Sequence, residues 1–410
     1  MSHRPMEGVR VLEVSQFTFA PVAGAVLADW GADVIKVEHA ETGDAQRGLR
    51  TGWNGQSVGS FHPIMEHSNR GKRSIGLDLG TAGGREVLDE LARSCDVFIT
   101  NFLPDSRARL NIDVDALRQV NPQIIYVRAS AFGDNGPEAS RGGFDSNVYW
   151  ARMGSSAGLT PADSPRPMSM PGPAYGDTIG GTTIAGGIAA ALFSRAQTGE
   201  PSELDVSLLS VGAWAMGLAV DISLLTGNSR PIAPLSDGPA TAPTNPLAGD
   251  YRTSDGRWIN ISFLQPGRYW RDFCKHIGRA DLADDPRFDS AEGLMANAAA
   301  AADILRGELV SRSFAEWIEA FGTLEGQWAP VQNSVEVGLD EQLRANGYIV
   351  TVDDAEGHPR QLVANPVQFD RTPPALRRAP QFAEHTDELL RELGYCEEKI
   401  IELKIEGAAT

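Results

Sequence analysis

The sequence predicts an α/β protein with a doubly wound parallel sheet, because apolar segments of strand length alternate with helical patterns along its first third. Residues 9–14 and 32–38 have the apolar pattern of strands, and residues 21–30 between them form a helical segment that opens with proline. This arrangement predicts a βαβ unit. The alternation continues through predicted strands at 73–79, 96–100 and 124–128 and predicted helices at 82–93 and 114–120.

Such an alternation is typical of a Rossmann-like fold, in which ligands bind at the carboxyl ends of the strands. No GxGxxG pattern follows the first predicted strand, where Ser15-Gln16-Phe17-Thr18-Phe19 stands instead, and the chain has no GxxxxGK[ST] motif. We therefore expect a ligand other than NAD or ATP held in the usual manner.

A chain of 410 residues exceeds the size of one hydrophobic core, so we expect two domains. A helical pattern at 208–225 gives way to a Pro- and Ala-rich stretch at 231–246 that is typical of a linker. An Asp-Gly turn then predicts a hairpin at 251–261, followed by helical patterns in a smaller α+β domain. The predicted parts are a large domain at 1–206, a linker at 207–246, a small domain at 247–321, a second linker at 322–346 and a C-terminal part at 347–410 that returns to the large domain.

The charge balance and the cysteines exclude several classes of protein. With 54 acidic and 36 basic residues the formal net charge is −18, which opposes a nucleic-acid partner or a membrane-surface role. The three cysteines form no CxxC pair, and His62 and His67 do not share a helix face, so we predict no metal site and a reducing, cytoplasmic location. The N-terminal residues resemble no signal peptide, and the apolar run 179–193 is shorter than the roughly 20 residues that a bilayer requires.

The segment Tyr175-Gly176-Asp177-Thr178-Ile179 places a carboxylate before a stretch of small residues that predicts a close-packed helix ending near Gly199. Asp177 has two interpretations that are compatible. It is either the N-cap of this helix, which the local pattern favours, or a nucleophile whose glycine neighbours leave room for a substrate carbonyl. A helix N-terminus would keep the carboxylate ionised, which is the form that attacks.

The segment Gly154-Ser155-Ser156-Ala157-Gly158 matches the GxSxG pattern of a hydrolase nucleophile. That motif requires a strand before it and a helix after it, whereas residues 159–165 contain two prolines and predict no sustained helix. We therefore set the hydrolase interpretation aside.

Several basic residues lie near predicted strand ends in an otherwise acidic chain. Each is by itself more typical of a solvated surface, but together they suit a phosphate site. Asn101 and Phe102, at the end of one predicted strand, add an amide and an aromatic ring, so an adenine-bearing, multiply phosphorylated ligand is expected. The basic residues are Lys72, Arg73, Arg107, Arg109, Arg128 and Arg141.

Nearly the whole chain resembles the family III CoA-transferases, a group that includes the α-methylacyl-CoA racemases. The order and spacing of the fragments carry this resemblance. They are Gly31-Ala32-Asp33-Val34-Ile35-Lys36-Val37-Glu38, Thr42-Gly43-Asp44, Lys72-Arg73-Ser74-Ile75, Asn101-Phe102, Gly143-Phe144-Asp145, Gly176-Asp177 and Glu384-His385-Thr386-Asp387.

The resemblance implies that Asp177 attacks a donor acyl-CoA to form a mixed anhydride and then an aspartyl-CoA thioester, from which CoA passes to an acceptor carboxylic acid. It implies CoA and acyl-CoA as substrates, no permanently bound cofactor and an interlocked homodimer. Thr18, Phe19 and His39 depart from the family residues Gln, Ala and Arg. The expected CoA contacts are Thr18, Phe19, His39, Lys72, Arg73, Leu77, Asn101, Phe102, Arg109 and Arg141, and the expected substrate pocket contains Phe17, Phe144 and Gly176.

Two alternatives stand beside the transferase. The racemase branch of the family carries a histidine before the Asp of its Gly-x-Asp segment, and Phe144 stands there in this chain. Racemisation needs an acid and a base on opposite faces of the α-carbon, so the transferase is preferred. A non-catalytic acyl-CoA-binding paralogue is disfavoured because Asp177 and its flanking glycines are both present.

Overall fold

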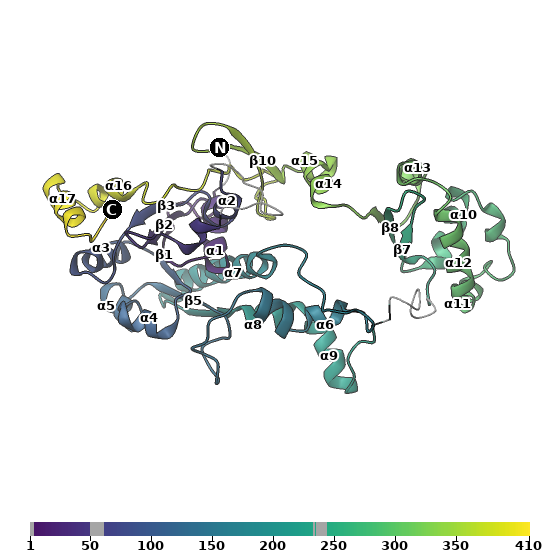
Figure 1. Cartoon of the computed structure of the whole chain (residues 1–410), viewed down its shortest axis with the longest axis horizontal. Helices are drawn as coiled ribbons and strands as arrows, with labels where there is room; N and C mark the ends of the chain where they lie inside the picture. The colour runs from purple at the N-terminus through teal and green to yellow at the C-terminus, as the bar shows by residue number, and fades with distance from the viewer. Residues whose placement is uncertain (1–3, 50–60, 233, 235–243) are drawn as a thin grey trace. The chain divides into compact units, whose positions relative to one another are not determined.

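The computed structural model describes residues 4–49, 61–232, 234 and 244–410, which fall into two compact units (Figure 1). Unit 1 contains residues 1–160, 166–230 and 341–410, and unit 2 contains residues 161–165 and 231–340. Most of the proline- and alanine-rich stretch 231–246, which the sequence predicts to be a linker, lies outside the described residues.

Unit 1 is built on a six-stranded sheet in which all neighbouring strands are parallel, as the sequence predicts. The strand order is β3-β2-β1-β4-β5-β6, so the chain reverses its direction of travel across the sheet between β1 and β4. The strands are β1 (Arg10–Val14), β2 (Asp33–Glu38), β3 (Arg73–Gly76), β4 (Val97–Thr100), β5 (Ile125–Ser130) and β6 (Glu203–Ser207). No sequence pattern had indicated β6.

Each face of the sheet carries its own hydrophobic core, because side chains alternate between faces along a strand. Val11 of β1 packs with the apolar side chains of α1 and α7, whereas Leu12 packs with those of α3, α5, α16 and α17. Figure 1 shows α16 and α17 beside α3. These elements are α1 (Phe19–Asp29), α3 (Ala82–Arg93), α5 (Val114–Val120), α7 (Tyr175–Thr198), α16 (Thr386–Glu392) and α17 (Glu397–Ile405).

Helices α1 and α7 approach closely because α7 is rich in glycine. A Cβ atom at Gly180 would lie 2.2 Å from the Phe19 ring, and one at Gly181 would lie 2.5 Å from Val22. The helix ends where predicted, at Gly199, which has a φ of 77°. This close packing brings the N-terminus of α7 to the end of the β1–α1 loop.

Shorter elements complete unit 1. The helix expected at 208–225 is broken at Met216 into α8 (Leu208–Ala215) and α9 (Gly217–Thr226), which are bent by 70°. In the described part of the chain no single helix is long and apolar enough to cross a membrane, and only this bent pair taken together meets that criterion. The others are η1 (Ala45–Gly48), α2 (Pro63–Asn69), α4 (Pro104–Arg109), η3 (Ser146–Arg152), α6 (Ser155–Leu159), α15 (Glu341–Ala345) and the hairpin strands β10 (Ile349–Asp353) and β11 (Pro359–Val363).

The GxSxG segment lacks the context of a hydrolase elbow. A π-helical turn, η3, precedes Gly154, and the five-residue helix α6 follows it. The motif therefore does not stand between a strand and a sustained helix.

Unit 2 is a small α+β body with its own core. Strands β7 and β8 form the hairpin that the Asp-Gly turn predicts, with Gly256 at a φ of 80°, and β9 adds to β8. Trp270, Phe273 and Trp317 are buried between this sheet and its helices. The elements are β7 (Ala248–Arg252), β8 (Trp258–Ser262), α10 (Pro266–His276), η4 (Ala280–Ala283), α11 (Ala291–Ala296), α12 (Ala298–Leu309), α13 (Phe314–Ala320), η5 (Phe321–Thr323), β9 (Trp328–Pro330) and α14 (Ser334–Leu339).

Candidate active site

The point where the strand order reverses carries a cavity of about 380 Å³ at the carboxyl ends of the strands. Asn101, which follows β4, bridges to the β1–α1 loop. Its Nδ2 donates to the Gln16 carbonyl at 2.7 Å, and its Oδ1 accepts the Gln16 N–H at 3.0 Å. Seven of the predicted CoA-contact, substrate-pocket and catalytic residues line this cavity: Phe17, Phe19, Asn101, Phe102, Arg141, Phe144 and Asp177.

A second cavity, of about 300 Å³, adjoins the first, because Phe102 lines both. His39, Leu77 and Arg109 lie in its wall, together with residues of the Thr42–Asp44 segment. The two cavities thus gather predicted residues from the ends of β2, β3 and β4 along one edge of the sheet.

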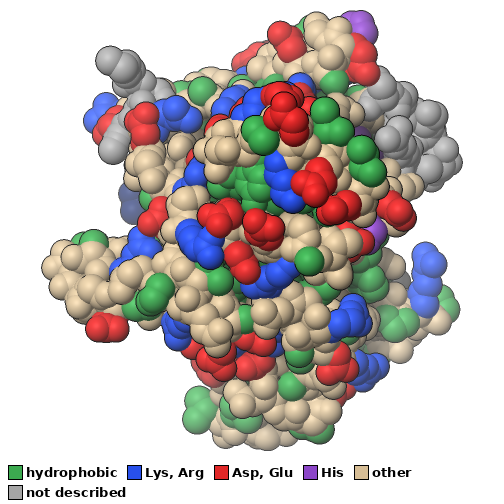
Figure 2. Space-filling view, turned by 90° about the vertical axis from the view of Figure 1, so that its left-hand side faces the viewer, with side chains coloured by type: hydrophobic (Ala, Val, Ile, Leu, Met, Phe, Trp, Pro, Cys, Tyr) green, Lys and Arg blue, Asp and Glu red, His purple; other side chains and the backbone are tan. Residues whose placement is uncertain are grey.

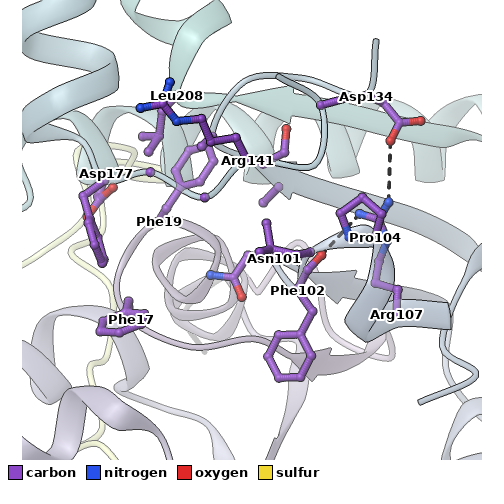
Figure 3. Close-up of a pocket in the computed structure, with 18 of the residues that line it drawn as sticks. Phe17, Phe19, Asn101, Phe102, Pro104, Arg107, Asp134, Arg141, Asp177 and Leu208 are labelled. Carbon is purple, nitrogen blue, oxygen red and sulfur yellow. Dashed lines mark hydrogen bonds and ion pairs between the residues drawn. The ribbon is translucent and has the colours of Figure 1, made fainter. Parts of the chain in front are cut away.

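Asp177 is the third residue of α7, so the N-cap interpretation of this carboxylate is wrong. The cap position is Ala174, which has a φ of 58°, and no side chain of its own caps the helix. The carboxylate of Asp145 accepts the Gly176 N–H at 3.2 Å and a second bond from the Asp177 N–H. The role expected of Asp177 is therefore performed by Asp145, and the Asp177 side chain is left to face the cavity (Figure 3).

The surroundings of Asp177 favour its protonated form. Burial first, and the nearby Asp145 carboxylate second, raise the pKa of Asp177 to about 7. Among the residues that the structure describes, no hydrogen-bond donor or cation pairs with its carboxylate. The expectation that the helix N-terminus keeps this group ionised is thus outweighed by desolvation and by the like charge.

His67 reaches the first turn of α7, whereas the sequence had predicted only that His62 and His67 are packed independently or exposed. Its Nε2 lies 2.8 Å from Thr178 Oγ1, and that hydroxyl donates to the Ala174 carbonyl at 2.8 Å. Because the hydroxyl proton is used, His67 must donate the other bond through Nε2–H. Burial lowers the pKa of His67 to about 4, so the imidazole is neutral and braces the turn that carries Asp177.

Lys72 and Arg73 line neither cavity. The Lys72 ammonium is buried and donates to Glu13, Asn69 and the Pro21 carbonyl, so all three of its protons are used. Arg73 pairs with Asp33, Glu388 and Glu392. Acidic and basic side chains are likewise intermixed on the face shown in Figure 2.

Thr18 and Gly176 also lie behind the cavity walls. The Thr18 hydroxyl donates to Gln46 Oε1 at 2.9 Å, and a Cβ at Gly176 would lie 2.5 Å from the Tyr149 ring. Both residues therefore support the site from the side that faces the protein core.

Two arginines supply positive charge to the first cavity. Arg141 is largely exposed and pairs with Glu138, while its guanidinium lies 5.5 Å from the centre of the Phe132 ring. Arg107 lies across the cavity from Asp177 and pairs with Asp134 at 3.5 Å (Figure 3). The sequence had placed Arg107 only among the basic residues near strand ends.

Asp354, Glu356 and His358 form a carboxylate and imidazole cluster at the turn between β10 and β11. The Asp354 carboxylate already accepts the N–H groups of Glu356 and His358 and the guanidinium of Arg360. These hydrogen bonds close the turn between β10 and β11, and they explain why the three side chains lie together.

The sequence model of CoA-transferase family III matches residues 6–386. The chain is 29% identical to the (R)-2-hydroxy-4-methylpentanoate CoA-transferase of Clostridioides difficile, over 97% of this chain and 98% of that protein. It is 28% identical to the cinnamoyl-CoA:phenyllactate CoA-transferase of Clostridium sporogenes, over 97% of this chain and 95% of that protein. A crystal structure of a CaiB/BaiF family protein from Brucella suis superimposes with a TM-score of 0.80 at 27% identity, covering 95% of this chain and all of that one.

Proposed function

This chain belongs to CoA-transferase family III, and on that premise we propose that it transfers CoA from an acyl-CoA donor to a carboxylic acid with Asp177 as the covalent nucleophile. One observation carries the proposal. A partly buried carboxylate without a cationic partner among the described residues faces a cavity at the switch point of a parallel sheet. A structural aspartate in such a place is normally paired or hydrogen-bonded, so an unpaired one is suited to chemistry.

In the proposed reaction an oxygen of the ionised Asp177 attacks the carbonyl carbon of the donor thioester, the C–S bond breaks and CoA leaves as the thiolate. The thiolate attacks the aspartyl carbonyl of the resulting mixed anhydride, which releases the donor acid and leaves CoA on Asp177 as a thioester. The acceptor carboxylate attacks this thioester and expels the thiolate. The thiolate then attacks the acceptor acyl carbon, which forms the new acyl-CoA and restores the carboxylate.

The two cavities divide the ligand between them in this proposal. His39 and Arg109 suit the nucleotide end of CoA, and the pantetheine chain passes Phe102 toward Asp177. Phe17, Phe19, Phe144 and Leu208 make the wall near Asp177 apolar, which suits an acyl group larger than formyl and excludes water from the covalent intermediates. Branched and aromatic 2-hydroxy acids, of the kinds in the names of the two relatives, are the first acceptors to test.

The test is to trap the covalent enzyme. The protein is mixed with a panel of acyl-CoAs without acceptor, treated with hydroxylamine and digested for mass spectrometry. We expect a hydroxamate at Asp177 in the wild-type protein and none in Asp177→Asn. The control is Asp134→Asn, which removes a different carboxylate of the same cavity and should still form the adduct at Asp177. A wild-type protein that exchanges CoA between acids without any modification of Asp177 would overturn the proposal.

No observation favours the racemase alternative, because Phe144 and no histidine precedes Asp145 at the cavity. An acyl-CoA whose α-proton exchanges in deuterated water without an acceptor acid would reverse this preference.

We also propose a homodimer, interlocked as in the family. Helices α8 and α9 leave Trp214, Leu218, Leu224 and Leu225 more than three-quarters exposed, which is unusual for large apolar side chains on a monomer. Light scattering during gel filtration should give twice the mass of one chain, and a monomer at micromolar concentration would contradict this.

A further inference from the structure

The β1–α1 loop presents Phe17 to the cavity in an uncommon backbone conformation. Phe17 has a φ of 63°, in the left-handed region, which costs a residue other than glycine about 1–2 kcal/mol. Its ring packs edge to face on Phe144 with the ring centres 5.5 Å apart, and both rings line the cavity that contains Asp177. Such a conformation persists only where the surrounding structure holds it.

The backbone of the loop is held by a buried ion pair. Asp44 Oδ1 accepts the Phe17 N–H at 3.1 Å, and Asp44 Oδ2 lies 2.9 Å from Lys36 Nζ. The same ammonium donates to the Ser15 carbonyl at 3.0 Å and pairs with Glu13 at 3.3 Å. Lys36 and Asp44 side chains are fully buried, so these bonds do not compete with water.

Neither residue of this pair lines the cavity that contains Asp177, and the pair reaches that cavity through the loop, although Asp44 also lies in the wall of the adjoining cavity. Gln16 is held separately by Asn101, and the Thr18 hydroxyl donates to Gln46, whose own N–H also donates to Asp44 Oδ1 at 2.9 Å. The Phe17 N–H, however, has only the Asp44 carboxylate as its partner among the described residues. Loss of that carboxylate therefore frees the one residue of the loop that is strained.

We propose that the buried Lys36–Asp44 pair is a positioning device that holds Phe17 in its left-handed conformation and thereby shapes the acyl wall of the Asp177 cavity. Asp44 is a positioning residue, because it acts on the substrate through Phe17. The inference rests on the proposed function, since it assigns a role to Phe17 in that reaction.

The test combines Asp44→Asn with Phe17→Ala in a double-mutant cycle on kcat/KM. An amide has one accepting oxygen, so the side chain introduced by Asp44→Asn cannot accept the Phe17 N–H and also face the Lys36 ammonium with an oxygen. The matched control is Asp29→Asn, which removes one charge from an equally buried pair, Asp29–Arg70 at 2.8 Å, that contacts neither the loop nor the cavity.

We expect Asp44→Asn to lower kcat/KM about 10- to 100-fold, as a small misplacement of a wall residue does. Asp29→Asn should lower thermal stability to a similar extent and change kcat/KM less than about twofold. In the Phe17→Ala background the effect of Asp44→Asn should fall to about twofold or less, because no ring remains to be positioned. Equal losses of activity in the two Asn variants, or an unchanged effect of Asp44→Asn without the ring, would overturn the inference.

Failure of the proposed function is distinguishable from failure of this inference. If wild-type protein forms no adduct at Asp177, crystal structures of Asp44→Asn and Asp29→Asn decide the positioning role by themselves. Phe17 should leave the left-handed region only in Asp44→Asn, and a retained positive φ in that variant would contradict the role.

Discussion

Two groups of buried or partly buried carboxylates in unit 1 have opposite electrostatic surroundings. Asp177 and Asp145 lie together at the start of α7 without a cationic partner among the described residues, and burial raises the pKa of both. Glu13 and Asp44, beneath the β1–α1 loop, instead lie among the ammonium groups of Lys36 and Lys72.

The difference shows how one fold uses the same side chain in two ways. Burial lowers the pKa of the Lys36 ammonium, but the surrounding carboxylates raise it by more. The ammonium therefore remains charged, and the paired cluster is rigid. Burial lowers the pKa of Lys72 to about 8, yet Glu13 keeps it paired. The Asp177 carboxylate at α7 has no cationic partner among the described residues that offsets the cost of its burial. Its ionised form is therefore destabilised, which favours its reaction with a substrate.

The largest expected effect comes from removing the unpaired charge itself. Asp177→Asn should lower the rate of CoA transfer by at least about 10³-fold, because the nucleophile is lost. It should also stabilise the protein at about pH 8 by up to about 4 kcal/mol, since an amide resembles the neutral acid that burial favours.

The sign of this stability change depends on pH. The pKa of Asp177 lies near 7 in the folded protein and near 3.8 when unfolded, so the folded state loses stability as pH rises between these values. Urea unfolding should therefore show the gain of the Asn variant at about pH 8 and little gain at about pH 4. A variant destabilised at the higher pH would show that Asp177 is paired after all.

Removing a cation from the paired cluster should have the opposite effect on stability. Lys36→Met leaves Glu13 and Asp44 short of a buried partner and should reduce the free energy of unfolding by about 3–5 kcal/mol. Lys399→Met, which breaks an exposed pair with Glu402, is the control and should cost about 1 kcal/mol or less. Similar losses in the two variants by urea unfolding would contradict the distinction between the clusters.

The coupling between the two unpaired carboxylates is tested by Asp145→Asn. The amide oxygen still accepts the Gly176 N–H, but the like charge beside Asp177 is gone, so the pKa of Asp177 should fall. In a plot of kcat/KM against pH, the value should then rise with a midpoint below about 7, because the ionised form of Asp177 attacks the thioester. Asp134→Asn, which removes a carboxylate paired with Arg107, should leave the midpoint in place, and an identical shift in both variants would exclude a specific coupling.

The smallest effect should come from the neutral support of α7. His67→Phe and Thr178→Val each remove the bond between His67 and Thr178, and Thr178→Val also removes the bond to the Ala174 carbonyl. Each variant should lower kcat about threefold to tenfold, near 1 kcal/mol. The double variant should be no slower than Thr178→Val alone, since that change already removes the bond to Thr178 that His67→Phe removes. Multiplicative losses in kcat would show that the two residues act separately.

Local sequence pattern was sufficient for the regular elements of unit 1. Helices α3 and α5 have the predicted bounds, because a polar face and an apolar face repeat at the helical period. The start of α7 was misjudged, because its cap comes from Asp145, which is remote in sequence. The expected long helix is broken at Met216, where the single following residue Gly217, without a proline, gives only a weak signal.

The amino-acid sequence by itself determined the parallel α/β sheet, and it singled out the sheet edge and the aspartate on which the proposed function depends, because periodicity and motif order are local properties. Only the tertiary structure decided which charges are compensated. It joined Lys36 to Asp44 and Asp145 to Gly176, brought His67 to Thr178, and withdrew Lys72 and Arg73 from the cavities. The pKa of a carboxylate depends on the charges and solvent within a few ångströms, and those neighbours come from distant parts of the chain.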